Sequence, residues 1–159
     1  MNEMRLLALL CLVPLGATAQ AINFDIAPTA SCKAAESSVN CVGLAANRCM
    51  DVNDGGYSTT GMSICTDHEF EWWDGQLNAV YKVTKRRLAG YDAESPDYAP
   101  SQVEALKNMQ RAWIPFRDAK CEYAATEWSG GSGAGPATIW CLMEETARQT
   151  IYLENRFQN

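Results

Sequence analysis

The sequence has little of what catalytic and metal sites are built from. Its 159 residues include a single histidine, His68, which lies between two carboxylates near the start of an expected helix. A lone imidazole cannot form a zinc site without thiolates, and a catalytic triad would need a nucleophile and an orienting acid that the sequence does not present. We therefore expect His68 to be a surface residue, and we expect no metal, no cofactor and no enzymatic activity.

Two other sources of chemistry are missing. Residues 129–136 are rich in glycine but lack the Lys-Ser/Thr ending of a phosphate-binding loop, which argues against nucleotide binding. Glu144 and Glu145 are adjacent, so a helix would point them in different directions, and they do not form the acid/base pair of a glycosidase. We expect both carboxylates on a solvated face.

The sequence also lacks an apolar run long enough to span a bilayer. The apolar segment Leu6–Leu15 follows the basic Arg5 and leads to small residues ending at Ala19, which is the layout of a secretory signal peptide. A lipoprotein signal at Cys11 would need a small residue before that cysteine, which the sequence does not provide. We therefore expect residues 1–19 to be a signal peptide cleaved near Ala19, and the protein to be periplasmic or secreted.

Basic residues are outnumbered by acidic ones. The chain has 13 Lys and Arg against 19 Asp and Glu, a net charge of −6, and loss of the signal peptide removes one residue of each sign. This balance argues against binding to nucleic acid or to anionic membranes, and it favours a cationic partner. About 140 residues are enough for one domain with its own core, so we expect residues 20–159 to form a single domain.

Six cysteines remain after the signal peptide, an even number that predicts up to three disulfides in an oxidising compartment. They are Cys32, Cys41, Cys49, Cys65, Cys121 and Cys141. If Cys32 and Cys41 belonged to one unbroken helix they would face opposite sides, so we expect them to bridge other segments more easily than each other. The pairing of the first four cysteines stays open.

Apolar periodicity predicts three long amphipathic helices. The first has its stripe at Trp73, Leu77, Val80, Tyr81, Thr84 and Leu88. The second starts at a capping box, Ser101 to Glu104, and its stripe is Val103, Leu106, Met109, Trp113, Phe116, Ala124 and Trp128. The third starts at Pro136 and has Leu142, Thr146, Gln149, Tyr152, Leu153 and Arg156 on one face. The expected fold is all-α: a disulfide-linked bundle of three longer helices plus a short N-terminal helix at residues 32–41.

The best-supported disulfide joins the second and third helices. Cys121 lies seven residues before Trp128, and Cys141 lies five residues after Pro136. In an antiparallel hairpin both cysteines therefore lie roughly 7–11 Å from the connecting tip. We predict a bond between Cys121 and Cys141.

Residues 49–60 carry turn-forming residues and predict a surface loop. Asp51, Asn53 and Asp54 give it some likeness to a calcium-binding loop. Met62 stands at the twelfth position, where such a loop needs a bidentate glutamate, so calcium binding is not expected.

Two polar sets repeat the same helical spacing. Gln110, Trp113 and Arg117 share one face of the second helix, with Asp118 beside them, and the first helix has a matching set at Asp74, Asn78 and Tyr81. One interpretation is a binding face with Trp and Arg anchors. The other is a polar network that sets helix register, for instance through Arg117 and Asp74.

The segment Gly130, Gly131, Ser132 and Gly133 has no large side chain to bury and forms a flexible tip between two helices. It could enter a cleft of a partner protein, or it could serve only as the hairpin connection. Both interpretations stay open at this point.

The pattern as a whole resembles the LprI-type lysozyme-inhibitor family. The residues that carry the resemblance are Gly61, Met62, Cys65, Asp74, Leu77, Asn78, Tyr81, Gln110, Trp113, Arg117, Asp118, Cys121, the glycine-rich tip, Cys141 and Arg148. It implies a small exported helical domain with a family core at about residues 60–159. It also implies that the chain binds and inhibits lysozyme, or contacts another cationic exported protein, by occlusion and without chemistry of its own. Gly61 departs from the family pattern, which commonly has an acidic residue there. The alternative function is an envelope or cell-wall interaction module without inhibitory activity.

Overall fold

The computed structural model describes residues 22–156, and these residues are almost entirely helical. Their elements are α1 (Ala27–Glu36), the 3₁₀ helix η1 (Val39–Cys41), α2 (Leu44–Val52), α3 (Thr59–Glu94), α4 (Gln102–Thr126) and α5 (Ala134–Asn155). The predicted all-α, disulfide-linked fold is confirmed. The signal peptide predicted at residues 1–19 lies outside the described residues.

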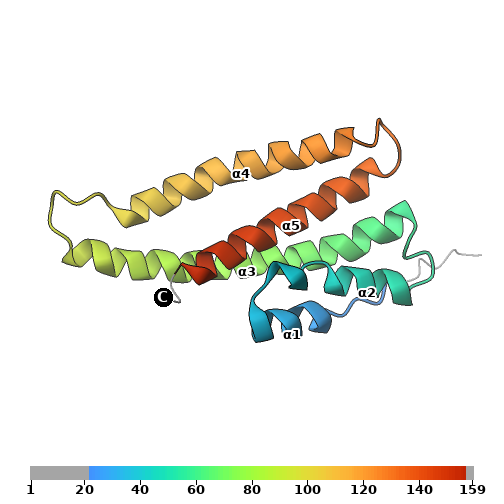
Figure 1. The fold of residues 1–159 in the computed structure, drawn as a ribbon, viewed down its shortest axis with the longest axis horizontal. Coiled ribbons are helices and arrows are strands. Elements are labelled where there is room, and N and C mark those ends of the chain that lie inside the picture. The colour runs from blue at the N-terminus through green and yellow to red at the C-terminus, as the bar shows by residue number, and fades with distance from the viewer. Residues whose placement is uncertain (1–21, 157–159) are drawn as a thin grey trace, which may run out of the picture.

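Three long helices make up most of the domain. In Figure 1, α3 runs the length of the molecule, α4 returns antiparallel to it, and α5 lies between them. α2 packs against the N-terminal half of α3, α1 packs against α2, and η1 contacts α1 and α5. None of the described helices has both the length and the hydropathy needed to cross a bilayer.

The core forms two clusters along α3. The first surrounds Trp73, which is fully buried with Met143 and Ala147 of α5. The second joins α3, α4 and α5 through Leu77, Leu88, Leu106 and Leu153. The stripe expected on the first long helix is thus the buried face of α3.

The expected apolar stripe of α4 is only half correct. Leu106 is buried, but Phe116 is 60% exposed and Trp128 is 53% exposed. α4 diverges from α3 toward its C-terminal end (Figure 1), so no helix covers that part of its outer face. On α5, Tyr152 and Arg156 are likewise exposed, although they share the expected face with buried Leu153.

The loop expected at residues 49–60 is wrong in its first part. Residues 49–52 belong to α2, whose Ala45, Ala46, Cys49 and Met50 are buried, and only residues 53–58 form the turn. The N-terminal region therefore contains two short α-helices and a 3₁₀ helix, where the sequence predicted one short helix. α2 depends on contacts with distant residues, which local sequence patterns do not register.

The structure also overturns the expectation for Cys32 and Cys41, which pair with each other. α1 ends at Ser37, whose backbone is left-handed (φ 43°), and η1 returns the chain so that the two Cα atoms are 5.4 Å apart. The expectation assumed that residues 32–41 form one unbroken helix, whereas the helix is interrupted at Ser37. Cys49 pairs with Cys65, and Cys121 pairs with Cys141, the pair that the hairpin spacing predicts.

A buried carboxylate joins the N-terminal region to α3. Glu69 is 0% exposed, and its two oxygens accept hydrogen bonds from the backbone N–H groups of Gly43 and Ala46, each at 2.7 Å. The indole N–H of Trp73 donates to the same carboxylate at 3.1 Å. Thr29 Oγ1 accepts from the N–H of Ala45 at 3.0 Å. The unpaired N–H groups at the start of α2 are therefore bonded by side chains from α1 and α3.

A second carboxylate fixes the connection between α3 and α4. Asp92 accepts hydrogen bonds from the Ser101 hydroxyl and from the backbone N–H groups of Gln102 and Val103. The Ser101 hydroxyl first, then the N–H groups of Val103 and Gln102, lower the pKa of Asp92. Ser101 Oγ also accepts from the N–H of Glu104, as expected of a helix cap.

We expect Glu69→Gln to lower the free energy of unfolding by about 2–3 kcal/mol, because an amide replaces one charged acceptor and presents a donor to N–H groups. Urea denaturation measures the change. Glu71→Gln, an exposed position on the same helix, is the control and should change stability by less than about 0.5 kcal/mol. Equal effects of the two changes would contradict the role assigned to Glu69.

Asp92→Asn should destabilise the protein at neutral pH, and the difference should disappear in acid. Because the native pKa is lowered, the stabilisation is fully present above the unfolded pKa of about 4 and is lost as the pH falls through the native pKa. Urea denaturation from pH 7 to pH 2 tests this. Asp97→Asn in the same connection should leave the pH profile of the parent unchanged.

Candidate functional site

The structure brings the two predicted polar sets together in one groove between α3 and α4. The groove has a volume of about 510 Å³. Its lining is Asp74, Leu77, Asn78, Tyr81, Lys85, Lys107, Gln110, Arg111, Trp113, Ile114 and Arg117. Both sets are at helical spacing, and the antiparallel pairing of α3 and α4 makes them face each other.

Arg117 does not pair with Asp74 as the register hypothesis suggested. Its guanidinium donates to the carboxylate of Asp118 at 2.8 and 2.9 Å, and to Thr146 of α5 at 3.4 Å. It also lies 5.1 Å from the centre of the Trp113 ring. Asp74 instead accepts from the Asn78 amide at 2.8 Å. Arg117 therefore pairs with the carboxylate of the next residue, Asp118, and not with the carboxylate of Asp74 on the other helix.

The polar network that does form ties α4 to α5. Gln149 donates to Gln110 at 3.0 Å, and Lys120 pairs with Glu145 at 2.8 Å. Glu145 is 9% exposed, so the expectation that it lies on a solvated face is wrong. The Glu145 carboxylate lies at the contact of α5 with α4, where it pairs with Lys120. His68 is exposed, as expected.

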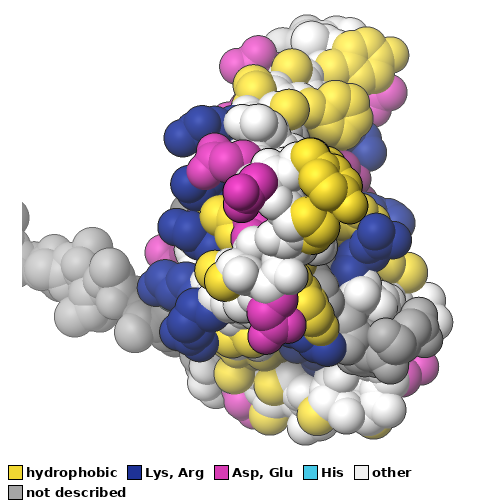
Figure 2. Space-filling model, turned by 90° about the vertical axis from the view of Figure 1, so that its left-hand side faces the viewer, with side chains coloured by type: hydrophobic (Ala, Val, Ile, Leu, Met, Phe, Trp, Pro, Cys, Tyr) yellow, Lys and Arg dark blue, Asp and Glu magenta, His cyan; other side chains and the backbone are white. Residues whose placement is uncertain are grey.

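One end of the groove is cationic although the chain is acidic. Lys107 forms an ion pair with Glu104 and is the main cause of the lowered pKa of that carboxyl, with smaller contributions from Arg111 and Lys85. Arg111 and Lys85 form no ion pair or hydrogen bond with another described side chain. Figure 2 looks onto this end of the molecule and shows lysine and arginine side chains on both of its flanks.

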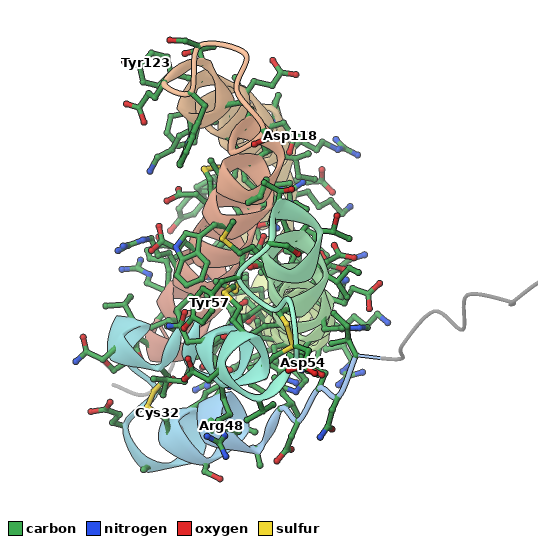
Figure 3. All side chains as sticks on the ribbon, turned by 90° about the vertical axis from the view of Figure 1, so that its right-hand side faces the viewer. Cys32, Arg48, Asp54, Tyr57, Asp118 and Tyr123 are labelled. Atoms are coloured by element: carbon green, nitrogen blue, oxygen red, sulfur yellow. A yellow bond between two sulfur atoms is a disulfide. The ribbon has the colours of Figure 1, made fainter. Side chains whose placement is uncertain are left out.

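A different surface lies where α4 meets α5. It consists of three exposed aromatic residues, two carboxylates and the glycine-rich turn, and we call it the tip surface: Phe116, Glu122, Tyr123, Glu127, Trp128 and residues 129–133. Tyr123 is 67% exposed and lies at the extremity of the molecule (Figure 3). Arg117 is paired with Asp118 and Lys120 with Glu145, so the carboxylates of Glu122 and Glu127 dominate its charge.

The glycine-rich turn has a defined shape. Ser129 and Gly130 both have positive φ, 49° and 81°, which favours glycine at the second position. Gly133 is buried under the Trp128 ring, because a Cβ there would lie 2.1 Å from Trp128 Cε3. Gly131 and Ser132 are exposed.

The predicted site residues thus fall on two surfaces. Gln110, Trp113 and Arg117 line the groove, and Asp118 lies beside it, paired with Arg117. The set Gly130, Gly131, Ser132 and Gly133 belongs to the tip surface. The sequence predicts neither Tyr123 nor Phe116 as an exposed aromatic residue. Phe116 belongs to the apolar stripe expected on the second helix and Tyr123 to no predicted set, although their spacing of seven residues puts both on one helix face.

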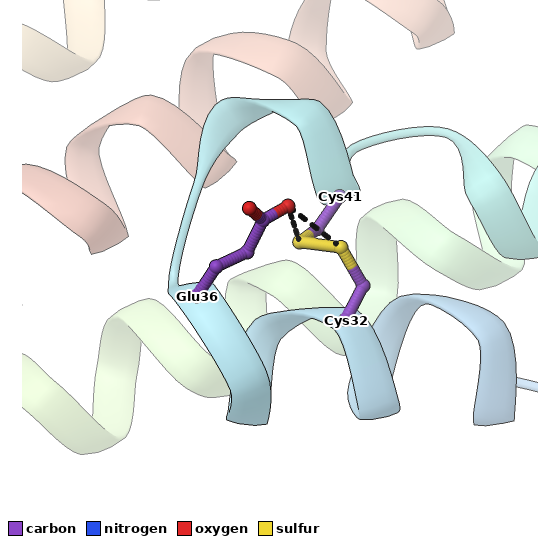
Figure 4. Close-up of side chains that lie close together, drawn as sticks. All are labelled: Cys32, Glu36 and Cys41. Carbon is purple, nitrogen blue, oxygen red and sulfur yellow. Dashed lines mark hydrogen bonds between the residues drawn. A yellow bond between two sulfur atoms is a disulfide. The ribbon is translucent and has the colours of Figure 1, made fainter.

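A small cluster near the N-terminus has the composition of a metal site but not its chemistry. Glu36 Oε1 lies 3.3 Å from Cys32 Sγ and 3.6 Å from Cys41 Sγ (Figure 4). The two sulfurs are bonded to each other. Neither offers the thiolate that a metal would need.

Comparisons with known proteins give the following matches. The family model described as "Lysozyme inhibitor LprI" matches residues 49–153. The chain is 35% identical over 106 residues to "Uncharacterized protein R02472" of Rhizobium meliloti (strain 1021), which covers 64% of this chain and 76% of that protein. It is 27% identical over 107 residues to "Uncharacterized protein YecT" of Escherichia coli (strain K12), with 57% and 59% covered. No solved structure matches the chain.

Gly133→Ala should displace the Trp128 ring, because the added methyl group occupies the space of that ring. The expected result is a shifted indole N–H resonance of Trp128 in NMR spectra. The unfolding free energy should change by less than about 1 kcal/mol, since the ring is half exposed and can move. Gly135→Ala is the control, because nothing lies within 4 Å of its added Cβ. An unmoved Trp128 resonance would contradict the packing described.

Proposed function

Because the chain belongs to the LprI family of lysozyme inhibitors, we propose that it binds lysozyme and inhibits it by occlusion, without chemistry of its own. The matched residues 49–153 include α3, α4 and all but the end of α5, and therefore both the groove and the tip surface. The remaining question is which surface meets the enzyme.

The observation that carries the proposal is the composition of the tip surface. Phe116, Tyr123 and Trp128 are more than half exposed, and large aromatic side chains of this kind are common anchors of protein interfaces. Glu122 and Glu127 are exposed beside them. Lysozymes are commonly basic, so a negative field around the anchors would speed encounter and favour the correct orientation. Of the predicted site residues, the glycine-rich turn belongs to this contact surface.

We further infer that the protein acts outside the cytoplasm. Three disulfides fit an oxidising compartment, and the LprI family is one of exported proteins. The predicted cleavage near Ala19 is the means of export that the sequence suggests.

The first test is a lysozyme turbidity assay on peptidoglycan with the purified oxidised protein, using chicken-type and goose-type enzymes. We expect saturable inhibition of at least one type, weaker at physiological than at low salt because the charges of the tip surface are screened. Absence of inhibition for every type, with all three disulfides intact, would overturn the proposal.

If the tip surface binds lysozyme, changes to its side chains should weaken inhibition. Tyr123→Ala should weaken inhibition about tenfold or more, the scale of a lost interface anchor. The double change Glu122→Gln and Glu127→Gln should reduce the salt dependence. Tyr98→Ala is the matched control, since Tyr98 is 89% exposed at the opposite end of α4. Equal loss with Tyr98→Ala would place the contact surface elsewhere.

A further inference from the structure

The groove between α3 and α4 has features that lysozyme binding at the tip surface does not use. It combines cationic side chains at one end, apolar side chains in its middle, and at the other end the acceptors Asp74 and Asn78 together with Arg117, whose charge is paired with Asp118. We propose that it binds a saccharide that carries a carboxylate group.

The cationic end supplies the anion-binding groups. Lys85 and Arg111 are exposed and form no ion pair or hydrogen bond within the described part of the chain; their interaction with Glu104 is only a minor cause of its lowered pKa, so both head groups are available to a ligand. Lys107, which also lines the groove, is partly buried and forms an ion pair with Glu104. An arginine and a lysine that are free to converge suit a carboxylate, because charge-assisted hydrogen bonds are about twice as strong as neutral ones.

The middle of the groove suits a sugar ring. Leu77 is buried at 4% exposed and forms an apolar base, while Tyr81 and Trp113 are partly exposed on the two helices that flank it. Arg117 covers one side of the Trp113 ring. Aromatic side chains with polar groups close by are typical of small-ligand sites, and the volume of about 510 Å³ lies in the usual range.

The other end offers hydrogen-bond acceptors for hydroxyl groups. Asn78 donates to Asp74 Oδ2 at 2.8 Å. Asp74 Oδ1 and Asn78 Oδ1 accept no hydrogen bond from any residue that the structure describes. Sugar hydroxyls can donate to both oxygens.

The same lining argues against other anionic ligands. A nucleic acid would meet Asp74, Glu104 and Asp118 around the groove, and the chain has a net charge of −6. A fatty acid would place its chain against the amides of Asn78 and Gln110. An acidic saccharide would place its carboxylate at the cationic end, a sugar ring in the apolar middle and its hydroxyl groups at the acceptors.

Isothermal titration with two disaccharides tests the proposal on the full mature chain. The probe is N-acetylglucosaminyl-N-acetylmuramic acid, and the comparison is N,N′-diacetylchitobiose, which has similar rings without the carboxylate. We expect the acidic disaccharide to bind about tenfold tighter or more. A galacturonate trimer, measured in parallel, distinguishes wall glycan from other acidic saccharides.

Matched variants locate the binding. The double change Lys85→Gln and Arg111→Gln should weaken binding of the acidic disaccharide about tenfold or more, whereas Lys82→Gln with Arg86→Gln should change it by less than about twofold. The control pair removes the same charge from exposed positions of α3 that do not line the groove. No binding of any acidic saccharide, equal affinity for diacetylchitobiose, or equal loss in both variants would overturn the proposal.

The titration contains no lysozyme, so its result is independent of the proposed inhibition. The variant with Lys85→Gln and Arg111→Gln should also inhibit lysozyme like the parent, because neither side chain belongs to the tip surface. Retained inhibition with lost saccharide binding supports two separate surfaces. Joint loss of both would overturn their separation and assign both activities to one surface.

Discussion

The N-terminal half of the fold depends on one buried carboxylate. Glu69 forms no ion pair with any residue that the structure describes and is held by three N–H donors, two of them from the start of α2. A helix N-terminus is a favourable place for negative charge, which offsets part of the cost of burying Glu69. α2 in turn places Cys49 against Cys65. Gly43 is held against Trp140 of α5, where a Cβ would lie 2.7 Å from the ring.

The two proposed binding surfaces are parts of the long helices that the core leaves exposed. α5 packs between α3 and α4 and fills the first core cluster with Met143 and Ala147. Because α4 diverges from α3, its C-terminal half contributes side chains that the core does not need, such as Phe116 and Tyr123. The Cys121–Cys141 disulfide holds this extended hairpin closed.

The two surfaces differ in charge. In the groove, Lys85 and Arg111 form no ion pair with the residues described, and the tip surface has carboxylates at Glu122 and Glu127. The charges that sum to −6 are therefore distributed unevenly in the folded chain, with cations in the groove and carboxylates on the tip surface. Under the two proposals, a cationic enzyme and an acidic saccharide would occupy opposite kinds of surface, and neither would compete electrostatically with the other.

The sequence by itself determined the helical class, the buried face of α3 and the Cys121–Cys141 pair, because periodicity and hairpin spacing are local properties. It also placed Ser101 at the start of α4, where a cap bonds residues only three apart. The Cys32–Cys41 bond, α2 and the burial of Glu69 and Glu145 came from tertiary structure. Each depends on partners that the chain brings close only after it has folded, as Lys120 does for Glu145. For the same reason, the sequence named the groove residues Gln110, Trp113 and Arg117, but only packing showed that Asp74 and Tyr81 face them.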